Sequence, residues 1–323
     1  MNKCVFSERR TTGLLWYHVV FEWEDEIAKT LGMNVYPLEI PYTEDRKQAV
    51  IGEVKNILKP FRVKPDHWNL VHVMYPYISH RYRGMSVIPI YLDVPAKWVC
   101  KIAWETRKLP VYFVTSMDAY NSLHARQKNN KCIFLPLSIP DKYYKQLLPK
   151  KDIDVLQIGR KNSKLHEFML EYCKTHPSIS YVYREKDGYI STNGDLIGDA
   201  PTREDYMNLL GRARVSLVAS PAIDGDKDFG GYDFFTPRFF ESIVQYCHVI
   251  GRYPNNDEAN YFSMSDICPN VKTYEEFETT MNEKLRCENA MNIQGYASFI
   301  KRNLTSTRAM EMKTKIKEAG LTL

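Results

Sequence analysis

The sequence predicts an α/β protein with two doubly wound, parallel-sheet domains. Short apolar runs of strand length alternate with amphipathic stretches of helix length along the chain, the pattern of parallel sheets covered by helices. At 323 residues the chain exceeds the length at which one hydrophobic core usually stops growing. A lysine-rich connector follows residue 140 and reaches residue 151. We therefore expect one domain over residues 1–140, a second over 152–295 and a terminal helix over 296–323.

The first half contains six apolar runs that indicate strands, and a polar loop follows the first of them. The expected strands span residues 3–7, 34–40, 68–74, 87–92, 111–115 and 132–137. The expected helices span residues 19–31, 43–59, 96–107 and 117–128. The polar loop covers residues 9–15 and begins Arg-Arg-Thr-Thr-Gly.

The second half restarts the alternation with a buried run that ends at Gly159. The expected strands span residues 153–158, 180–184, 215–220 and 248–251. The expected helices span residues 164–175, 203–211 and 274–286, with a short helix after residue 236 and a long basic helix over 293–319. A loop rich in glycine and aspartate, DGDKDFGGYDF, precedes the short helix.

The short helix and its flanks, DFFTPRFFESIVQYCHVIG over residues 233–251, form the most informative segment. Thr236 is a suitable N-cap and Pro237 a suitable first helical residue. Glu241 then falls near the helix start, where the helix dipole favours a carboxylate that can accept hydrogen bonds from ligand hydroxyls. Free backbone amides at the same end favour an anion. A hydroxyl acceptor beside an anion site suits a nucleotide-sugar, whereas the alternative is an ordinary amphipathic helix between two strands.

This segment resembles the donor-binding element of GT-B nucleotide-sugar glycosyltransferases, in which two glutamates separated by seven residues precede a Gly-Xaa-Pro-Val-Ile strand. Here Asp233 and Glu241 have that spacing. The TPRFFES form is most similar to the "glycosyl transferases group 1" branch that includes CgeB-like spore-coat proteins. The resemblance implies a GT-B fold: two Rossmann-like domains facing a cleft, with the C-terminal helix crossing back to the first domain. It also implies that Glu241 binds the ribose and Asp233 the sugar, although aspartate is one methylene shorter than glutamate.

Basic residues follow the first strand of the second half. Gly159, Arg160 and Lys164 come at its carboxyl end, the edge at which open α/β sheets bind ligands. Arginine and lysine suit the oxygens of a diphosphate. The resemblance implies this role for the Gly-Arg…Lys element, but the spacing is one residue shorter than usual, so Lys161 is an alternative to Lys164. The amides around Thr236 and Arg238, with the Arg238 side chain, are expected to complete the donor site; the alternative is a solvated basic loop.

The acceptor is expected on the first domain. The candidate residues there are Arg9, Arg10, Thr12 and Gly13 of the polar loop, and His80 of a later loop. Retaining GT-B enzymes often carry a histidine after a mid-domain strand, and the alignment of that strand with residues 87–94 places Asp93 at its position. An aspartate there is a candidate catalytic base. It is equally a candidate hydrogen-bond partner, or an N-cap for the helix after Pro95. His72 is interpreted as a histidine buried in the sheet.

Charge and composition exclude several other classes of protein. A net charge of +5 is too small to indicate nucleic-acid binding. The seven cysteines show no CxxC spacing, as expected of reduced thiols in a cytoplasmic protein. We see no signal peptide, no apolar run long enough to span a bilayer, and no motif for a metal, a P-loop, a dinucleotide or a serine nucleophile. The basic terminal helix would allow peripheral contact at the inner face of the cell membrane, although such helices are usually just solvated.

The combined interpretation is a metal-independent glycosyltransferase that needs no cofactor. Its partners would be a nucleotide-sugar donor and a glycan or lipid-linked acceptor, in bacterial surface polysaccharide or glycoconjugate synthesis. A non-catalytic GT-B relative that binds a sugar nucleotide or scaffolds an assembly is the alternative. The identity of the base, the sugar and the acceptor, and the stereochemical outcome, are left open.

Overall fold

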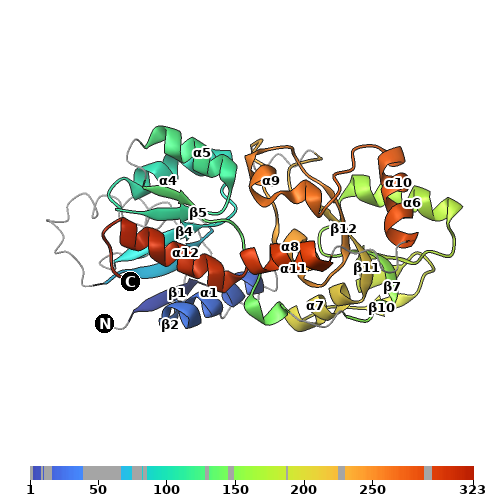
Figure 1. Cartoon of the computed structure of the whole chain (residues 1–323), viewed down its shortest axis with the longest axis horizontal. Coiled ribbons are helices and arrows are strands. Elements are labelled where there is room, and N and C mark those ends of the chain that lie inside the picture. The colour runs from blue at the N-terminus through green and yellow to red at the C-terminus, as the bar shows by residue number, and fades with distance from the viewer. Residues whose placement is uncertain are drawn as a thin grey trace. The chain divides into compact units, whose positions relative to one another are not determined.

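The computed structural model describes residues 3–8, 10, 17–38, 67–74, 82, 86–127, 131–144, 149–186, 188–224, 230–286 and 293–323. They divide into two compact units (Figure 1). Unit 1 contains the described residues of 1–136, 228–232 and 305–323, and unit 2 those of 137–227 and 233–304. Each unit is built on a six-stranded sheet, which confirms the predicted α/β class. The expected helix over 43–59 lies outside the described residues.

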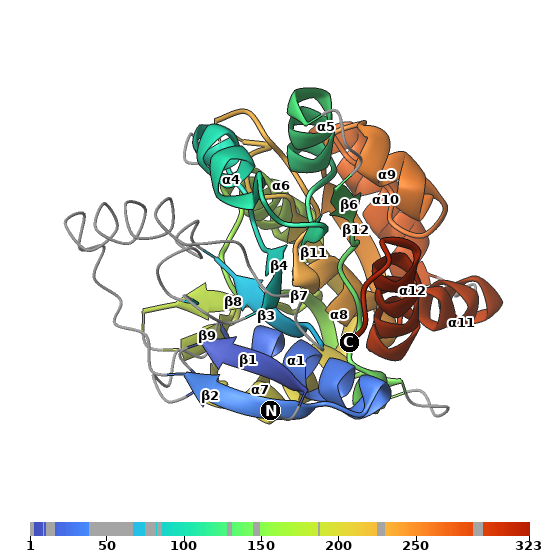
Figure 2. The same cartoon turned by 90° about the vertical axis from the view of Figure 1, so that its left-hand side faces the viewer.

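The sheet of unit 1 has the order β2-β1-β3-β4-β5-β6. Its strands are β1 Cys4–Glu8, β2 Asn34–Leu38, β3 Asn69–Val73, β4 Val87–Tyr91, β5 Tyr112–Val114 and β6 Cys132–Phe134. All neighbouring pairs are parallel. Figure 2 shows strands β1, β2, β3 and β4 of unit 1 from another side. Every residue of β3 and β4 is buried, as expected of central parallel strands covered on both faces. Strand β4 is accordingly apolar throughout, whereas β3 also buries Asn69 and His72.

The helices of unit 1 include one from the far end of the chain. They are α1 His18–Leu31, α4 Val99–Thr106, α5 Met117–Arg126 and α12 Thr305–Glu318. Helix α12 packs against α1, and the Thr322 carbonyl accepts a hydrogen bond from the Trp68 amide just before β3 (2.8 Å). The expected helix over 96–107 is instead a 3₁₀ turn, η2 Ala96–Trp98, followed by α4.

The sheet of unit 2 has the order β10-β9-β8-β7-β11-β12. Its strands are β7 Ile153–Gln157, β8 Tyr181–Glu185, β9 Gly188–Ser191, β10 Leu196–Gly198, β11 Ala213–Ala219 and β12 His248–Arg252. Strands β8, β7, β11 and β12 are parallel, whereas β9 and β10 are antiparallel additions at one edge. The sequence interpretation, which expected parallel strands, did not include β9 and β10. Asn193-Gly194 between β9 and β10 is a hairpin signal that the alternation of longer elements obscured.

The helices of unit 2 form two groups that both contact β11, so the sheet lies between them (Figure 1). One group is α6 Ser163–Thr175 with α10 Tyr274–Arg286; the other is α7 Arg203–Gly211, α8 Pro237–Val244 and α11 Ile293–Arg302. The unit also contains the short helix α9 Asp257–Phe262 and the 3₁₀ turns η3 Asp141–Tyr143 and η5 Met264–Asp266. Side chains cap the start of three of these helices: Asn162 caps α6, Thr202 with Asp205 forms a capping box on α7, and Asn256 caps α9.

The expected single helix over 293–319 is two helices, α11 and α12, because the helix is interrupted at Asn303 and Leu304. The Asn303 carbonyl accepts a hydrogen bond from the Ile139 amide (2.8 Å), and Leu304 forms a parallel bridge with Ile139. The Asn303 side chain also donates to the Phe299 carbonyl (2.8 Å). These tertiary bonds replace the next turn of the helix. In the part of the chain that the structure describes, no helix is long and apolar enough to cross a membrane.

Gly251 in β12 lies where no side chain fits. A Cβ added there would be 2.6 Å from Cys268 Sγ and 3.2 Å from the ring of Phe239 on α8. We predict that Gly251→Ala lowers the free energy of unfolding by about 1–3 kcal/mol through overpacking, measured by urea denaturation. Adding Cys268→Ala removes the worst contact and should recover part of the loss. An unchanged stability for Gly251→Ala would contradict this packing.

Candidate functional site

The expected donor-site residues of unit 2 lie around the carboxyl ends of its parallel strands. Gly159 and Arg160 follow β7, and Arg238 lies in the first turn of α8. The Arg238 side chain covers the turn after β7: its Nη1 donates to the Arg160 carbonyl (3.2 Å), and a Cβ on Gly159 would be 3.0 Å from Arg238 Nε. Gly159 also has a left-handed φ of +71°, so only glycine fits both constraints well. The structure thus joins two elements that are 79 residues apart in the sequence.

The first turn of α8 carries an unpartnered hydroxyl. Thr236 is the N-cap residue by position, but its side chain makes no capping hydrogen bond, contrary to the expectation from the sequence. Its Oγ1 is buried and has no hydrogen-bond partner among the described residues, and the same is true of Ser220 Oγ directly after β11. A buried hydroxyl without a partner costs free energy. Both groups are therefore suited to contact a polar ligand.

Glu241 is buried and both of its carboxylate oxygens are occupied. Its Oε1 accepts a hydrogen bond from Arg203 Nη2 (2.5 Å), and its Oε2 accepts one from the Tyr206 hydroxyl (2.9 Å). Burial, and next the charge of Glu241, raise the pKa of Tyr206 well above its usual value, so this hydroxyl remains a donor. A carboxylate has about four acceptor positions. Glu241 can therefore bind a ribose hydroxyl only through a remaining lone pair or after Arg203 moves.

Arg203 and Tyr206 were missed in the sequence interpretation. They occupy positions three apart on α7 and so share one face of that helix. The Arg203 guanidinium also lies over the rings of Tyr143 (5.6 Å) and Tyr206 (5.1 Å). The only signal in the sequence is this spacing within an amphipathic helix, and it does not show that α7 packs beside α8.

Asp233 stabilises the loop before α8 through hydrogen bonds. It is buried, and its Oδ1 accepts hydrogen bonds from the Ala222 amide (3.2 Å) and the Phe234 amide (3.1 Å). Its main-chain carbonyl accepts a hydrogen bond from the Asn256 side chain (3.2 Å). The expected sugar-binding role of Asp233 stays a prediction.

Two surface ion pairs involve the candidate lysines. Lys161 Nζ lies 2.6 Å from a carboxylate oxygen of Glu185, and Lys164 Nζ lies 3.1 Å from one of Glu167. Exposed pairs of this kind contribute little to stability, so neither lysine is held away from a ligand. The choice between the two lysines stays open.

Asp224, in the loop after β11, is paired with an arginine and an asparagine side chain. Its carboxylate pairs with Arg252 (2.6 Å) and accepts a hydrogen bond from Asn162 (2.6 Å). Burial opposes ionisation of this carboxyl, but the hydrogen bonds from Arg252 and Asn162 outweigh it and hold its pKa below the usual value. Among the described residues, no group of three or more histidine, cysteine or acidic side chains is arranged to hold a metal ion.

In unit 1, Asp93 follows β4 in a strained conformation. Its φ of +47° is left-handed, which is uncommon for a residue other than glycine. Burial raises the pKa of its carboxyl to about 6, and no partner of the carboxyl is found among the described residues. The helical turn that follows is capped by Pro95 without a side-chain bond, so Asp93 is not its N-cap. Two of the roles expected for Asp93 remain: a catalytic base, or a hydrogen-bond partner.

The other acceptor-side candidates are occupied or not described. Arg10 pairs with Asp25 (2.8 Å) and Glu24 (3.4 Å), and its Nε donates to Ser7 Oγ (3.1 Å). Its guanidinium therefore binds side chains of unit 1 itself. His72 is buried in β3, with Nδ1 3.7 Å from Glu24, as the sequence interpretation expects. Arg9, Thr12, Gly13 and His80 lie outside the described residues.

Comparisons with solved structures identify the fold. No family model matches the chain, and no curated protein matches it. AviGT4, a glycosyltransferase involved in avilamycin A biosynthesis, is similar with a TM-score of 0.58, 12% identity and coverage of 98% of both chains. UDP-GlcNAc 2-epimerase from Neisseria meningitidis, bound to UDP-GlcNAc, has a TM-score of 0.53 and 11% identity and covers 98% of this chain and 100% of its own.

A chain of the GtfA/B complex is similar with a TM-score of 0.52 and 10% identity over 86% of this chain. The present chain spans 61% of that longer chain. Identities this low show the fold alone. The protein has the GT-B fold of nucleotide-sugar glycosyltransferases and UDP-GlcNAc 2-epimerases, which confirms the predicted architecture; the more specific CgeB-like resemblance stays a prediction.

The buried ion pair at Glu241 predicts a large effect on stability. Arg203→Ala leaves the Glu241 carboxylate buried with only Tyr206 as a partner, and we expect a loss of about 3 kcal/mol in the free energy of unfolding. Adding Glu241→Gln removes the buried charge and should restore part of it. Arg212→Ala, which breaks an exposed pair with Asp152, is the matched control and should cost less than about 1 kcal/mol. Equal losses for the Arg203 and Arg212 variants would contradict the predicted difference.

The raised pKa of Asp93 predicts a pH-dependent stability. The folded-state pKa of about 6 lies above the usual 3.8, so between these values the folded state binds a proton that the unfolded state has lost. Stability therefore falls as pH rises through this window. We predict that Asp93→Asn stabilises the protein by up to about 3 kcal/mol at pH 8 and by little at pH 4, measured by urea denaturation. A gain that is the same at both pH values would show that Asp93 does not titrate in this way.

Proposed function

We propose that the protein is a glycosyltransferase that moves a sugar from a nucleoside diphosphate to a hydroxyl acceptor. Proteins of similar structure include the glycosyltransferase AviGT4 and a UDP-GlcNAc 2-epimerase bound to UDP-GlcNAc. The observation that carries the proposal is the contact of Arg238 with the Gly159–Arg160 turn. It brings the basic turn after β7 next to the helix start that carries Thr236.

The donor diphosphate would bind at this junction. Arg238 and Arg160 supply cationic donors, and the amides at the start of α8 add the positive end of a helix dipole. The unpartnered hydroxyls of Thr236 and Ser220 offer further donors to phosphate oxygens. During transfer, negative charge grows on the leaving diphosphate, so fixed donors here would stabilise the transition state without a metal ion.

Glu241 would orient the nucleoside by binding its ribose. Arg203 and Tyr206 fix its carboxylate in one position, which reduces the ordering needed when ligand binds. A ribose hydroxyl would donate to a remaining lone pair of the carboxylate. The proposal does not require Glu241 to change its protonation state.

Asp93 of unit 1 is the proposed base. Its carboxyl is ionised above about pH 6, close to the working range at which a general base is most effective. It would accept the proton of the acceptor hydroxyl as that oxygen bonds to the anomeric carbon and the bond from this carbon to the diphosphate breaks. The acceptor is proposed to be a glycan or a lipid-linked sugar.

Two other functions are distinguished by assay. Epimerisation of a sugar nucleotide is a candidate because a UDP-GlcNAc 2-epimerase is similar over the whole of both chains. Binding without turnover is a candidate because both oxygens of Glu241 already have protein partners. Incubation with sugar nucleotides separates the three: release of nucleoside diphosphate that increases with added acceptor indicates transfer, an isomeric sugar nucleotide indicates epimerisation, and neither product indicates binding alone.

Nucleotide affinity should depend on Arg238. We predict that Arg238→Ala weakens binding of the best ligand among UDP, GDP, ADP and CDP by about tenfold or more, because charge-assisted hydrogen bonds to the phosphates are lost. Isothermal titration calorimetry measures this, with Lys174→Ala on the exposed face of α6 as the control with an equal change of charge. Absence of binding by all four nucleotides in the unmodified protein would refute the donor site.

A further inference from the structure

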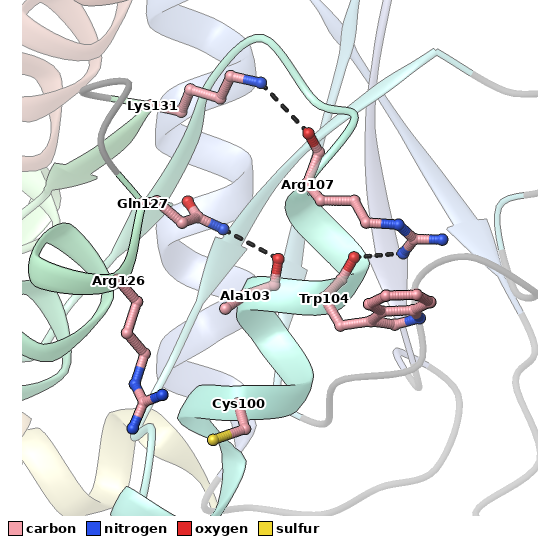
Figure 3. Close-up of a pocket in the computed structure, with 7 residues that line it drawn as sticks. All are labelled: Cys100, Ala103, Trp104, Arg107, Arg126, Gln127 and Lys131. Atoms are coloured by element: carbon pink, nitrogen blue, oxygen red, sulfur yellow. Dashed lines mark hydrogen bonds between the residues drawn. The ribbon is translucent and has the colours of Figure 1, made fainter.

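The pocket between α4 and α5 in unit 1 has cations that are directed apart (Figure 3). Arg126 and Lys131 lie at its opposite ends, and the stacked pair of Trp104 and Arg107 lies on the other side of α4. These groups do not converge on one ligand. In unit 2, by contrast, polar groups converge on the turn after β7, and one of them has no part in the donor site described above.

That group is the hydroxyl of Tyr189, which reaches the turn from a strand that does not adjoin β7. Tyr189 lies on β9, and β8 separates β9 from β7 in the sheet. Its hydroxyl oxygen nevertheless accepts a hydrogen bond from the Gly159 amide (3.2 Å), so the side chain crosses β8. Only 1% of the residue is exposed. The contact joins the edge hairpin of β9 and β10 to the glycine turn on which the proposed donor site depends.

The hairpin holds Tyr189 in one place. A Cβ on the neighbouring Gly188 would lie 2.8 Å from the Gly198 carbonyl oxygen, so β9 and β10 approach each other closely there. Tyr189 is paired with Arg184 of β8 in the antiparallel ladder. The Arg184 guanidinium carbon lies 5.8 Å from the centroid of the tyrosine ring, within the range of a cation–π contact. The ring is therefore positioned before any ligand binds, and less ordering is needed on binding.

The Tyr189 hydroxyl still has a proton to donate. A tyrosine hydroxyl donates one hydrogen bond and also accepts. Here the Gly159 amide uses its accepting side, and no acceptor for its proton is found among the residues that the structure describes. Burial raises the pKa of Tyr189 above its usual value, although the Gly159 amide, Arg184 and Arg238 oppose this. The hydroxyl therefore stays protonated and is a buried donor that lacks an acceptor.

Tyr189 and Arg238 meet at one residue. The hydroxyl binds the Gly159 amide, and Arg238 Nε lies 3.0 Å from the position that a Cβ of Gly159 would take. An amide that donates to Tyr189 is not free to bind a phosphate itself. The hydroxyl takes over that role, because accepting a bond from the amide polarises it and strengthens the bond that it donates in turn. An anion beside the Arg238 guanidinium would supply the acceptor that the hydroxyl lacks.

We propose that Tyr189 is a further ligand of the donor diphosphate, and that its hydroxyl donates to a phosphate oxygen while it accepts from the Gly159 amide. This assignment rests on the proposed function. It adds to the donor site a residue that lies outside the motif of α8 and outside the basic turn. The hairpin of β9 and β10 is then part of the donor site rather than only an extension of the sheet.

Removal of the hydroxyl alone tests the assignment. We expect Tyr189→Phe to weaken binding of the best ligand among UDP, GDP, ADP and CDP by about tenfold, because a hydrogen bond to a charged phosphate is lost. Isothermal titration calorimetry measures the affinity. Tyr172→Phe is the matched control: this tyrosine of α6 is also buried, and its hydroxyl donates to Asn282 Oδ1 (2.8 Å). The control loses a hydroxyl and its hydrogen bond in the same unit and should keep its nucleotide affinity.

A fluorinated side chain separates contact with the phosphate from a role in holding the turn. A tyrosine fluorinated next to its hydroxyl and incorporated in place of Tyr189 keeps the ring, but its hydroxyl is a stronger donor and a weaker acceptor. Tighter nucleotide binding by this protein, with weaker binding by Tyr189→Phe, is the expected result. Equal or weaker binding by the fluorinated protein would show that the hydroxyl only positions Gly159, and would overturn the proposed contact.

The outcomes also distinguish this proposal from the donor site itself. Nucleotide binding that is lost in Arg238→Ala but unchanged or tighter in Tyr189→Phe would leave the donor site in place and overturn the role of Tyr189. Absence of nucleotide binding in the unmodified protein would overturn both.

Discussion

The contact between Arg238 and the turn after β7 is the interaction on which the proposed function depends. Parallel strands end at one edge of a sheet, but side chains from different loops must still meet there to make a site. Gly159 permits this meeting because it has no Cβ and adopts a left-handed φ. A Cβ at this position would lie 3.0 Å from Arg238 Nε, so any other residue would push the guanidinium away from its present place across the turn.

Glu241 on α8 shows how one buried carboxylate can contribute to the stability of the fold and also be placed to bind a ligand hydroxyl. Removing it from water is costly unless its partners are well placed. Arg203 and Tyr206 provide those partners, and their positions depend on the packing of α7 against α8. A ligand hydroxyl would then meet an acceptor whose position is already fixed. Asp93 of unit 1 is the opposite case, a half-buried carboxyl for which the described residues supply no partner.

Sequence reasoning recovered what depends on local pattern. The runs at β4, β7 and β11 were recognisable because these central parallel strands are rich in buried apolar residues, and α8 was recognisable from Thr236-Pro237. It failed where tertiary contacts decide: the antiparallel edge of β9 and β10, and the break at Asn303 that Ile139 imposes. The same limit applies to the site. Glu241 and Arg238 were proposed from their motif, whereas the contacts of Arg203 and Tyr206 with Glu241 form only when α7 and α8 pack together.

A crystal structure with a bound nucleoside diphosphate tests the central claim most directly. The account predicts phosphate oxygens within about 3 Å of Arg238 and of the amides at the start of α8, with the ribose directed toward Glu241. A nucleotide bound elsewhere, with Arg238 still lying across Gly159 and no phosphate beside it, would contradict it.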